Sequence, residues 1–299
     1  MQTTVTYTYQ AETPPPVLAG AAGATATRGY PLIYQIVADG SPTSYTLTGA
    51  LPLGVVFNPA TGLISGTPDE AGVFPVTVGA ANAGGSATRA ITLVAKPSLP
   101  DQRAAGVLDE PVSYQVQCSE SGSGVSFAAV GLPPGLVLDP ATGRITGTPT
   151  APGETICSIT ATKAGATTAA LLTVAVTTSP LQNWRLANFG TTENTGPAAD
   201  GADPDGDGQH NLAEFTAGTG PNDPRDFFRV LTAERTPAGF TVTAAGKAGR
   251  SYVLERRDPA GGWADAAPSG PLAADGTVTL TDPAPPPGSG MYRVKVMAP

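Results

Sequence analysis

The strongest constraint on this chain is an internal duplication. Residues 51–72 read LPLGVVFNPATGLISGTPDEAG and residues 132–153 read LPPGLVLDPATGRITGTPTAPG, with 13 of 22 positions identical at an offset of 81 residues. Self-similarity at a fixed period marks a tandem repeat of one structural unit. The shared residues are mostly those that start and close turns, so the two copies are predicted to share one backbone fold.

Alternating segments flank both blocks and indicate short strands. They precede the blocks at residues 30–38 and 111–118, and they close each copy at residues 87–97 and 169–180. Gly (37) and Pro (31) make up nearly a quarter of the 299 residues, which excludes a long helical bundle. Because 40% of the residues are hydrophobic, disorder is disfavoured as well. The chain is therefore predicted to be all-β, with many short strands joined by turns.

The two blocks resemble the immunoglobulin-like repeats, related to dystroglycan-type cadherin-like domains, that occur in arrays on bacterial surface and secreted proteins. The resemblance covers about residues 15–178 and implies tandem immunoglobulin-like β-sandwiches. The last part of the chain is more loosely similar to fibronectin type III domains, with six predicted strands where seven are usual. We predict an N-terminal strand with a Pro linker, two immunoglobulin-like domains, a calcium-binding loop and helix, and a C-terminal β-sandwich, at residues 1–14, 15–96, 97–179, 180–226 and 227–299.

The chain has two cysteines, and both fall in the second repeat. By alternation Cys118 shares a strand face with Tyr114, and Cys157 shares one with Ile159, so both thiols are predicted to point into one core. The resemblance implies that they lie on the facing strands B and F and form an inter-sheet disulfide. The alternative is a pair of reduced core cysteines. A disulfide would imply an oxidising compartment outside the cytoplasm.

An acidic segment follows the second repeat, with eight of the 24 acidic residues between Glu193 and Asp226. Its centre, DPDGDGQHNLAE, matches the calcium-loop pattern D-x-[DN]-x-[DN]-G-x5-E. Calcium takes about six to eight oxygen ligands, which carboxylates at alternate positions around a sharp turn supply. The predicted ligands are Asp203, Asp205, Asp207, Gln209 through its main-chain carbonyl, Asn211 and Glu214.

This loop resembles the calcium loops of dockerins, thrombospondin type 3 repeats and EF-hands. Pro204 and the run GPAADGA before it leave no entering helix, so we expect only an exit helix over residues 211–217, ended by Gly218. His210, the only histidine, is interpreted as a loop side chain because imidazole suits softer metals than calcium. The alternative for the whole segment is a solvated acidic linker. As no second loop is visible, the module is predicted to be a stiff joint between domains.

The N-terminal residues form a strand pattern of their own. Thr3 to Gln10 alternate, with Val5, Tyr7 and Tyr9 on one face. The segment resembles the closing strand of each repeat, and no domain precedes it. Together with the six strands of the last domain, this pattern suggests head-to-tail strand donation between subunits, a contact that does not close and so builds a filament. Two alternatives remain: the chain is a slice of a longer protein, or the strand pairs with the first sandwich.

Composition disfavours several classes of function. The net charge is −8 and no basic stripe is present, which disfavours a nucleic-acid partner. No apolar run could span a membrane, and the N-terminus lacks a signal-peptide pattern, so we expect a mature form. A single histidine and the absence of a phosphate-binding loop argue against an enzyme.

The sequence therefore predicts a non-enzymatic, calcium-stiffened structural protein, extracellular or on the cell surface, that assembles with itself into a filament. The alternative is an adhesive or carbohydrate-binding stalk module cut from a larger secreted or surface protein. In that case Trp184 and Trp263 are candidates for a stacking platform on a glycan or other surface ligand. A short helix over residues 181–190 is expected to dock Trp184 against the calcium loop or the neighbouring sandwich.

Overall fold

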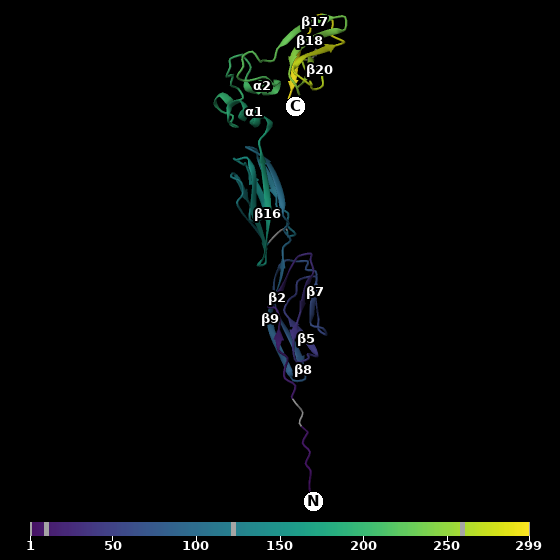
Figure 1. The fold of residues 1–299 in the computed structure, drawn as a ribbon. Helices are drawn as coiled ribbons and strands as arrows, with labels where there is room; N and C mark the ends of the chain where they lie inside the picture. Colours follow the sequence, from purple (N-terminus) through teal and green to yellow (C-terminus); the bar gives the residue numbers. More distant parts are fainter. Residues whose placement is uncertain (1, 9–11, 121–123, 258–260, 299) are drawn as a thin grey trace. The chain divides into compact units, whose positions relative to one another are not determined.

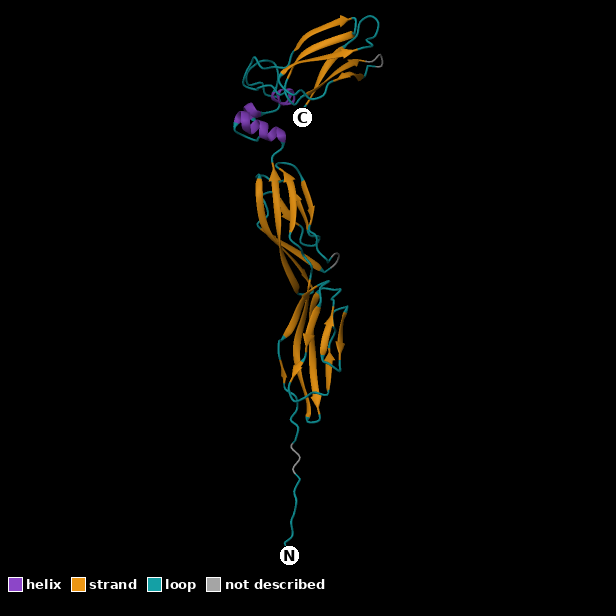
Figure 2. Ribbon diagram, turned by 45° about the vertical axis from the view of Figure 1, so that its right-hand side comes forward, coloured by secondary structure: helices purple, strands orange, loops and turns teal. Residues whose placement is uncertain are grey.

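The protein is built mostly of β-strands, as its sequence predicts, and the strands form tandem sandwiches with a short helical segment (Figures 1 and 2). The structure, a computed structural model, describes residues 2–8, 12–120, 124–257 and 261–298. Its contacts divide the chain into two compact units, Met1–Thr177 and Thr178–Pro299.

The first sandwich consists of a four-stranded sheet of order β2-β9-β8-β5 and a three-stranded sheet of order β3-β7-β6. β1 and β4 form a separate two-stranded ladder. β2 runs parallel to β9, and the other neighbours are antiparallel. The core includes Ile64 and Leu93, both fully buried. The strands are Leu18–Ala19 (β1), Gly23–Thr27 (β2), Leu32–Gln35 (β3), Val37–Ala38 (β4), Ser44–Thr48 (β5), Val55–Asn58 (β6), Leu63–Gly66 (β7), Gly72–Asn82 (β8) and Gly85–Lys96 (β9).

The second sandwich repeats this topology. Its sheets have the orders β10-β16-β15-β12 and β11-β14-β13, and β10 again runs parallel to the last strand. Its core includes Ile145, Ile159 and Leu172, all almost completely buried. The strands are Gln102–Val107 (β10), Val112–Gln115 (β11), Val125–Val130 (β12), Leu136–Leu138 (β13), Arg144–Gly147 (β14), Gly153–Lys163 (β15) and Ala166–Thr177 (β16). The duplicated sequence therefore gives a duplicated strand order.

The turns of the two duplicated blocks have the same side-chain hydrogen bonds and the same backbone conformation. The side chain of Asn58 accepts hydrogen bonds from the main-chain N–H groups two and three residues later, and that of Asp139 does the same in the second copy. Gly62 and Gly143 both have a φ of 71°. A Cβ atom at either position would lie within about 3 Å of an aromatic ring of the same sandwich, so the turn needs glycine for space as well as for conformation.

The predicted disulfide is wrong, because Cys118 and Cys157 are both free. Both lie at the same core, as the alternation predicts, with Cys157 buried and Cys118 packed beside the cluster. Cys157 sits within β15, and its thiol donates to the carbonyl of Leu172 (3.1 Å). Cys118 lies beyond the end of β11, where the chain is bonded to the preceding linker instead, through Ser119 N–H to the carbonyl of Ser98 (2.9 Å). Burial raises the pKa of both thiols.

The third sandwich has two sheets of three strands, with the orders β17-β18-β21 and β20-β19-β22. All six strands lie where alternation predicts them. Tyr252 and Leu254 are fully buried at the centre of the core. The strands are Val230–Thr236 (β17), Gly239–Gly246 (β18), Ser251–Arg257 (β19), Trp263–Pro268 (β20), Gly276–Asp282 (β21) and Tyr292–Met297 (β22).

The N-terminal segment pairs with nothing over its described residues, 2–8, which form no strand in the structure. Val5 is 66% exposed and Tyr7 is 90% exposed. Tyr9, the third residue of the predicted self-assembly face, lies outside the described residues. The alternative in which this strand pairs with the first sandwich therefore has no support over residues 2–8.

Candidate metal centre

One short helix precedes the acidic segment and a second lies within it. Helix α1, Pro180–Phe189, begins with a capping box between Ser179 and Gln182 and ends at Gly190, which adopts a left-handed conformation. A single 3-10 turn follows at Gly196–Ala198, and residues 199–210 contain no helix. The loop therefore has no entering helix directly before it, in agreement with its Pro- and Gly-rich flank.

Helix α2, Asn211–Ala217, follows the loop where the sequence predicts it. His210 caps its first turn, with Nδ1 accepting a hydrogen bond from the main-chain N–H of Ala213 (3.3 Å). Gly218 ends the helix in a left-handed conformation with a φ of 80°. His210 thus has a local structural role, which agrees with its interpretation as a loop side chain.

Asp203, Asp205 and Asp207, here called the Asp cluster, each offer a carboxylate oxygen, and these atoms lie within 4.8 Å of one another. Turns of the loop hold them in place, because each carboxylate also accepts main-chain hydrogen bonds from residues two to five positions later. Asp205 Oδ2 and Asp207 Oδ2 are buried and have no hydrogen-bond partner among the described residues. The Asp cluster can therefore hold a metal ion such as calcium.

Glu214 is the most unusual acid of the segment. It lies in the first turn of α2, is completely buried, and neither carboxylate oxygen has a hydrogen-bond partner among the described residues. Burial, followed by the charges of the Asp cluster, raises the pKa of Glu214 to about 7. Buried carboxylates are normally hydrogen-bonded or bound to a cation, so the unpartnered oxygens of Glu214 fit a cation site.

The other two predicted ligands are also held in place. The side-chain amide of Asn211 donates to the carbonyls of Pro197 and Ala199, both at 2.7 Å, while its Oδ1 is buried and unpartnered in the described structure. The side chain of Gln209 donates to the carbonyl of Phe228 (2.9 Å), which directs the side chain away from any metal role. The prediction for Gln209 concerned its main-chain carbonyl and stays a prediction, as does the complete ligand set.

Three further acids of the segment, none of them a predicted ligand, form ion pairs. Asp200 forms an ion pair with the buried Arg185 of α1. Asp226 pairs with Lys247 at 2.6 Å, and Asp223 pairs with Arg225 at 3.2 Å. No sequence signal indicated the pairing of Arg185 with Asp200, because the buried residues of α1 are the polar Gln182 and Arg185. The acidic composition thus serves two functions, a candidate cation site and a set of ion pairs.

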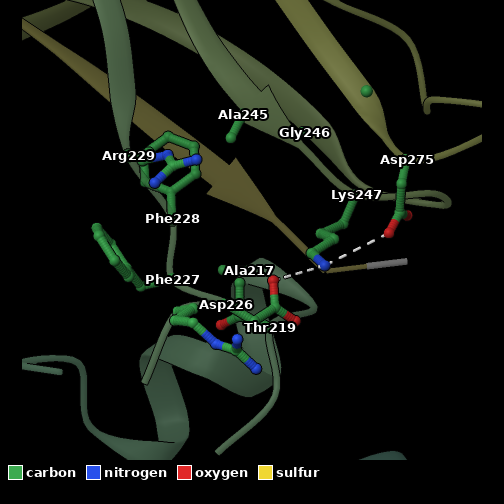
Figure 3. A pocket seen from close by; sticks show the side chains of 12 residues that line it. Ala217, Thr219, Asp226, Phe227, Phe228, Arg229, Ala245, Gly246, Lys247 and Asp275 are labelled. Atoms are coloured by element: carbon green, nitrogen blue, oxygen red, sulfur yellow. Dashed lines mark ion pairs between the residues drawn. The ribbon is translucent and has the colours of Figure 1, made fainter. Parts of the chain in front are cut away.

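The segment also packs against the third sandwich, within the same compact unit. Lys247 of the β18–β19 connection lies between Asp226 and Asp275, at 2.6 and 3.4 Å, beside a cavity of about 200 Å³ (Figure 3). The hydrogen bond to Asp226 is the main reason why the pKa of Lys247 is raised. Arg250 donates to the carbonyl of Phe215 in α2 (2.8 Å). These contacts fix the end of α2 to the sandwich.

Neither tryptophan forms an open platform. Trp184 of α1 makes edge-to-face contacts with Phe189 and with Phe215 of α2, at centroid distances of 5.8 and 5.9 Å. Trp184 thus packs against α2, the exit helix of the loop, whereas the prediction placed it against the loop itself or the neighbouring sandwich. The ring of Trp263 is covered by the guanidinium group of Arg293, at 4.3 Å from the ring centroid.

The family of the chain follows from its repeats. The family model described as "Putative Ig domain" matches residues 15–96 and 97–177, more than half of the chain. The chain belongs to this family. Ig-like modules of this kind are typically non-catalytic. None of the curated proteins matches the sequence.

Similar solved structures include fragments of cadherins and parts of glycoside hydrolases. Drosophila N-cadherin EC1-3 is 13% identical over 56% of this chain and 69% of that chain, with a TM-score of 0.25. Human Protocadherin-24 EC1-2 is 14% identical over 56% of this chain and 99% of that chain, with a TM-score of 0.24. A "putative alpha-galactosidase/melibiase" from Bacteroides fragilis is 20% identical over 32% of this chain and 21% of that chain, with a TM-score of 0.27. The matched part of this chain spans about a fifth to a third of the length of the glycoside hydrolases among these structures.

Among the described residues, no helix is long and apolar enough to cross a membrane.

Proposed function

We propose that this protein is a non-enzymatic structural subunit that works outside the cell or on its surface and joins to copies of itself, head to tail, by donating its N-terminal strand. One observation carries the proposal: residues 2–8 alternate, pair with nothing, and expose Val5 and Tyr7. An extended segment with apolar side chains on one face can add to a sheet edge of another molecule. Because such a contact is heterologous and does not close, it would produce a filament.

Calcium is the proposed cofactor, bound by the Asp cluster, the main-chain carbonyl of Gln209, Asn211 and Glu214. Five buried oxygen atoms without hydrogen-bond partners support it: Asp205 Oδ2, Asp207 Oδ2, Asn211 Oδ1, and Oε1 and Oε2 of Glu214. Hard cations take oxygen ligands of this kind, and the loop resembles those of dockerins and thrombospondin type 3 repeats. A bound cation would neutralise these charges and hold the loop to α2.

The proposed role of the cation is to stiffen the subunit. The loop contacts the third sandwich through Gln209, whose side chain donates to the carbonyl of Phe228, and the residues after α2 contact it through Asp226, which pairs with Lys247. Ordering the loop would therefore fix the helical segment on the sandwich. Calcium modules outside cells typically bind the ion at about 10⁻⁴ to 10⁻³ M, so a calcium loop is compatible with the proposed extracellular location. The free cysteines lend that location no support, since no disulfide is formed.

Sedimentation velocity and electron microscopy of the purified full chain test the proposal. We expect fibres that lengthen with calcium and shorten with a chelator, and a chain lacking residues 2–12 that stays monomeric. Fibres that persist without residues 2–12 would contradict strand donation. An adhesive or sugar-binding role would require an accessible platform, and a glycan array with the Trp263→Ala variant as control would test it.

A further inference from the structure

The third sandwich is open along one side. In the described residues, β22 pairs only with β19 and β17 pairs only with β18, so each presents an unpaired edge. An apolar groove with a cavity of about 250 Å³ lies between these two edge strands. It is lined mainly by Val230, Ala233, Phe240, Val242, Leu254 and Val294.

The groove reaches the core. Val242 and Leu254 at its floor belong to the buried cluster, whereas Tyr292 and Val294 of β22 are only partly buried against it. In the second sandwich the strand that corresponds to β22 is β15, and it is not an edge strand: β15 has β12 on one side and β16 on the other. The side chains of β16 that face the core, Leu172 and Val174, are almost completely buried. The groove therefore lies where one further strand would complete the third sandwich.

The occupant of this groove should be uncharged. Arg293 is the only charged residue that lines it, and its guanidinium group pairs with Glu255 and covers the ring of Trp263. No charge in the lining is left for a charged partner, and a buried unpaired charge would cost much free energy. Residues 2–8, QTTVTYT, contain no charged residue.

The N-terminal segment also fits in pattern and length. Val5 and Tyr7 are two residues apart and so point to the same side of an extended chain, which can enter an apolar groove. Thr4 and Thr6 would then face solvent. Residues 3–8 match the length of β22, which has six residues. Backbone groups on the free edge of β22 can pair with such a segment, and the apolar side chains give specificity.

We infer that the groove between β17 and β22 binds residues 3–8 of a second copy of this chain, as a strand antiparallel to β22 with Val5 and Tyr7 in the groove. The orientation is the one that β16 adopts beside β15. This inference rests on the proposed function and adds the acceptor site to it. Each subunit would donate its strand at one end and receive a strand in its third sandwich.

Matched variants of the full chain test both partners of the contact. On the donor side, Val5→Asn/Tyr7→Asn removes the apolar face, and Thr4→Asn/Thr6→Asn is the control on the opposite face. On the acceptor side, Ala233→Trp fills the groove, and Thr232→Trp is the control at an exposed neighbour outside its lining. We expect the first member of each pair to raise the concentration needed for assembly by at least about 30-fold, the loss typical of a hot-spot residue. The two controls should assemble normally.

Mixing the two defective chains gives the decisive result. The Val5→Asn/Tyr7→Asn chain keeps its groove and the Ala233→Trp chain keeps its strand, so a mixture should form a one-to-one dimer by sedimentation and no fibres. If the Ala233→Trp variant formed fibres, the groove could not be the acceptor site, although filament assembly itself would still stand. The groove site would also be overturned if the Thr4→Asn/Thr6→Asn control assembled as poorly as the Val5→Asn/Tyr7→Asn variant.

A peptide of residues 2–8 separates the groove from the filament. It should bind the full-length Val5→Asn/Tyr7→Asn chain, as seen by tryptophan fluorescence, and should fail to bind that chain when Ala233→Trp is added. Binding of this kind would support the groove even if wild-type chains form no fibres, a result that would refute the filament alone. A wild-type chain that stays monomeric and excludes the peptide would show that the strand folds back on its own molecule, which would overturn donation to a second copy.

Discussion

The second and third sandwiches share an architecture but close it differently. In the second, β15, which corresponds to β22, has β12 on one side and β16 on the other, and the inward side chains of β15 and β16 are buried. In the third, β22 has one neighbour, and Val294 stays partly exposed. The second sandwich is thus complete within its own chain, whereas the third leaves an edge that another strand can cover.

The two sandwiches also differ in their neighbours within the described structure. The third packs against the acidic segment in one compact unit, and this segment contains the buried, unpartnered Glu214. Both tryptophans, Trp184 and Trp263, lie in that unit. Tryptophan fluorescence therefore reports the unfolding of Thr178–Pro299 alone, and it allows the closed and open sandwiches to be compared in the intact chain.

Removing calcium is expected to give the largest difference in unfolding stability between the two units. With calcium at about 100 times its dissociation constant, binding stabilises the second unit by about 2.7 kcal/mol. A chelator should therefore lower the urea midpoint seen by tryptophan fluorescence and leave the far-UV circular dichroism transition of the first unit unchanged. Glu214→Gln should abolish this sensitivity, while Glu193→Gln, an exposed acid of the same segment, should keep it. Equal responses of both units to the chelator would contradict the metal assignment.

Truncating one valine in each last strand should measure the effect of closure directly. Val174→Ala removes two methyl groups from a fully packed site, and we expect a loss of about 2 kcal/mol from the first unit. Val294→Ala removes the same atoms from a partly exposed site, and we expect about 1 kcal/mol from the second unit. Urea unfolding by circular dichroism and by tryptophan fluorescence measures the two losses. Similar losses at both sites would mean that the third sandwich is as well sealed as the second.

Acid should weaken the third sandwich through Glu255. This buried carboxylate of β19 pairs with Arg293 and Lys295 of β22, and the hydrogen bond from Arg293 lowers its pKa. A lowered folded pKa stabilises the protein above the unfolded pKa of about 4.3, and this contribution is lost as the pH falls through the folded value. The stability advantage of wild type over Glu255→Gln should therefore be constant near neutral pH and shrink below about pH 4.3. An advantage that grows in acid would contradict this pairing.

The smallest effect on stability is expected at the turn that the first and second sandwiches share. Exchanging the turn residues, Asn58→Asp and Asp139→Asn, keeps the oxygen that accepts the main-chain hydrogen bonds in each copy. The urea midpoint of the first unit should not change detectably for either exchange. Asp139→Ala, which removes the acceptor, should lower the midpoint measurably. A large effect of the exchange would show that the two turns are not interchangeable.

Local patterns predicted the parts of the structure that local forces set. Alternation placed all six strands of the third sandwich, and the spacing of Asp203, Asp205 and Asp207 placed three carboxylates within one loop. The Gly218 signal ended α2 at the residue where it ends. In each case the residues that interact are close in sequence, so their spacing already fixes their geometry.

Predictions that joined distant residues were less successful. Cys118 and Cys157 reach the same core, but the chain around Cys118 leaves β11 and follows the linker, so alternation alone could not decide whether the thiols meet. Asp200 and Asp226 lie in the same acidic segment as the predicted ligands, and their ion pairs with Arg185 and Lys247 were not predicted. Such pairings depend on how separate elements pack, which no local pattern contains.

The sequence by itself determined the repeated sandwich, the turns that build it and the order of the acids in the candidate metal loop, because backbone conformation and side-chain period act over a few residues. Only the tertiary structure decided that Glu214 is buried with no hydrogen-bond partner among the described residues and that the thiols stay free. It also decided that an apolar groove opens between β17 and β22. Burial and edge exposure are properties of packed sheets, and they arise only when strands far apart in the chain lie side by side.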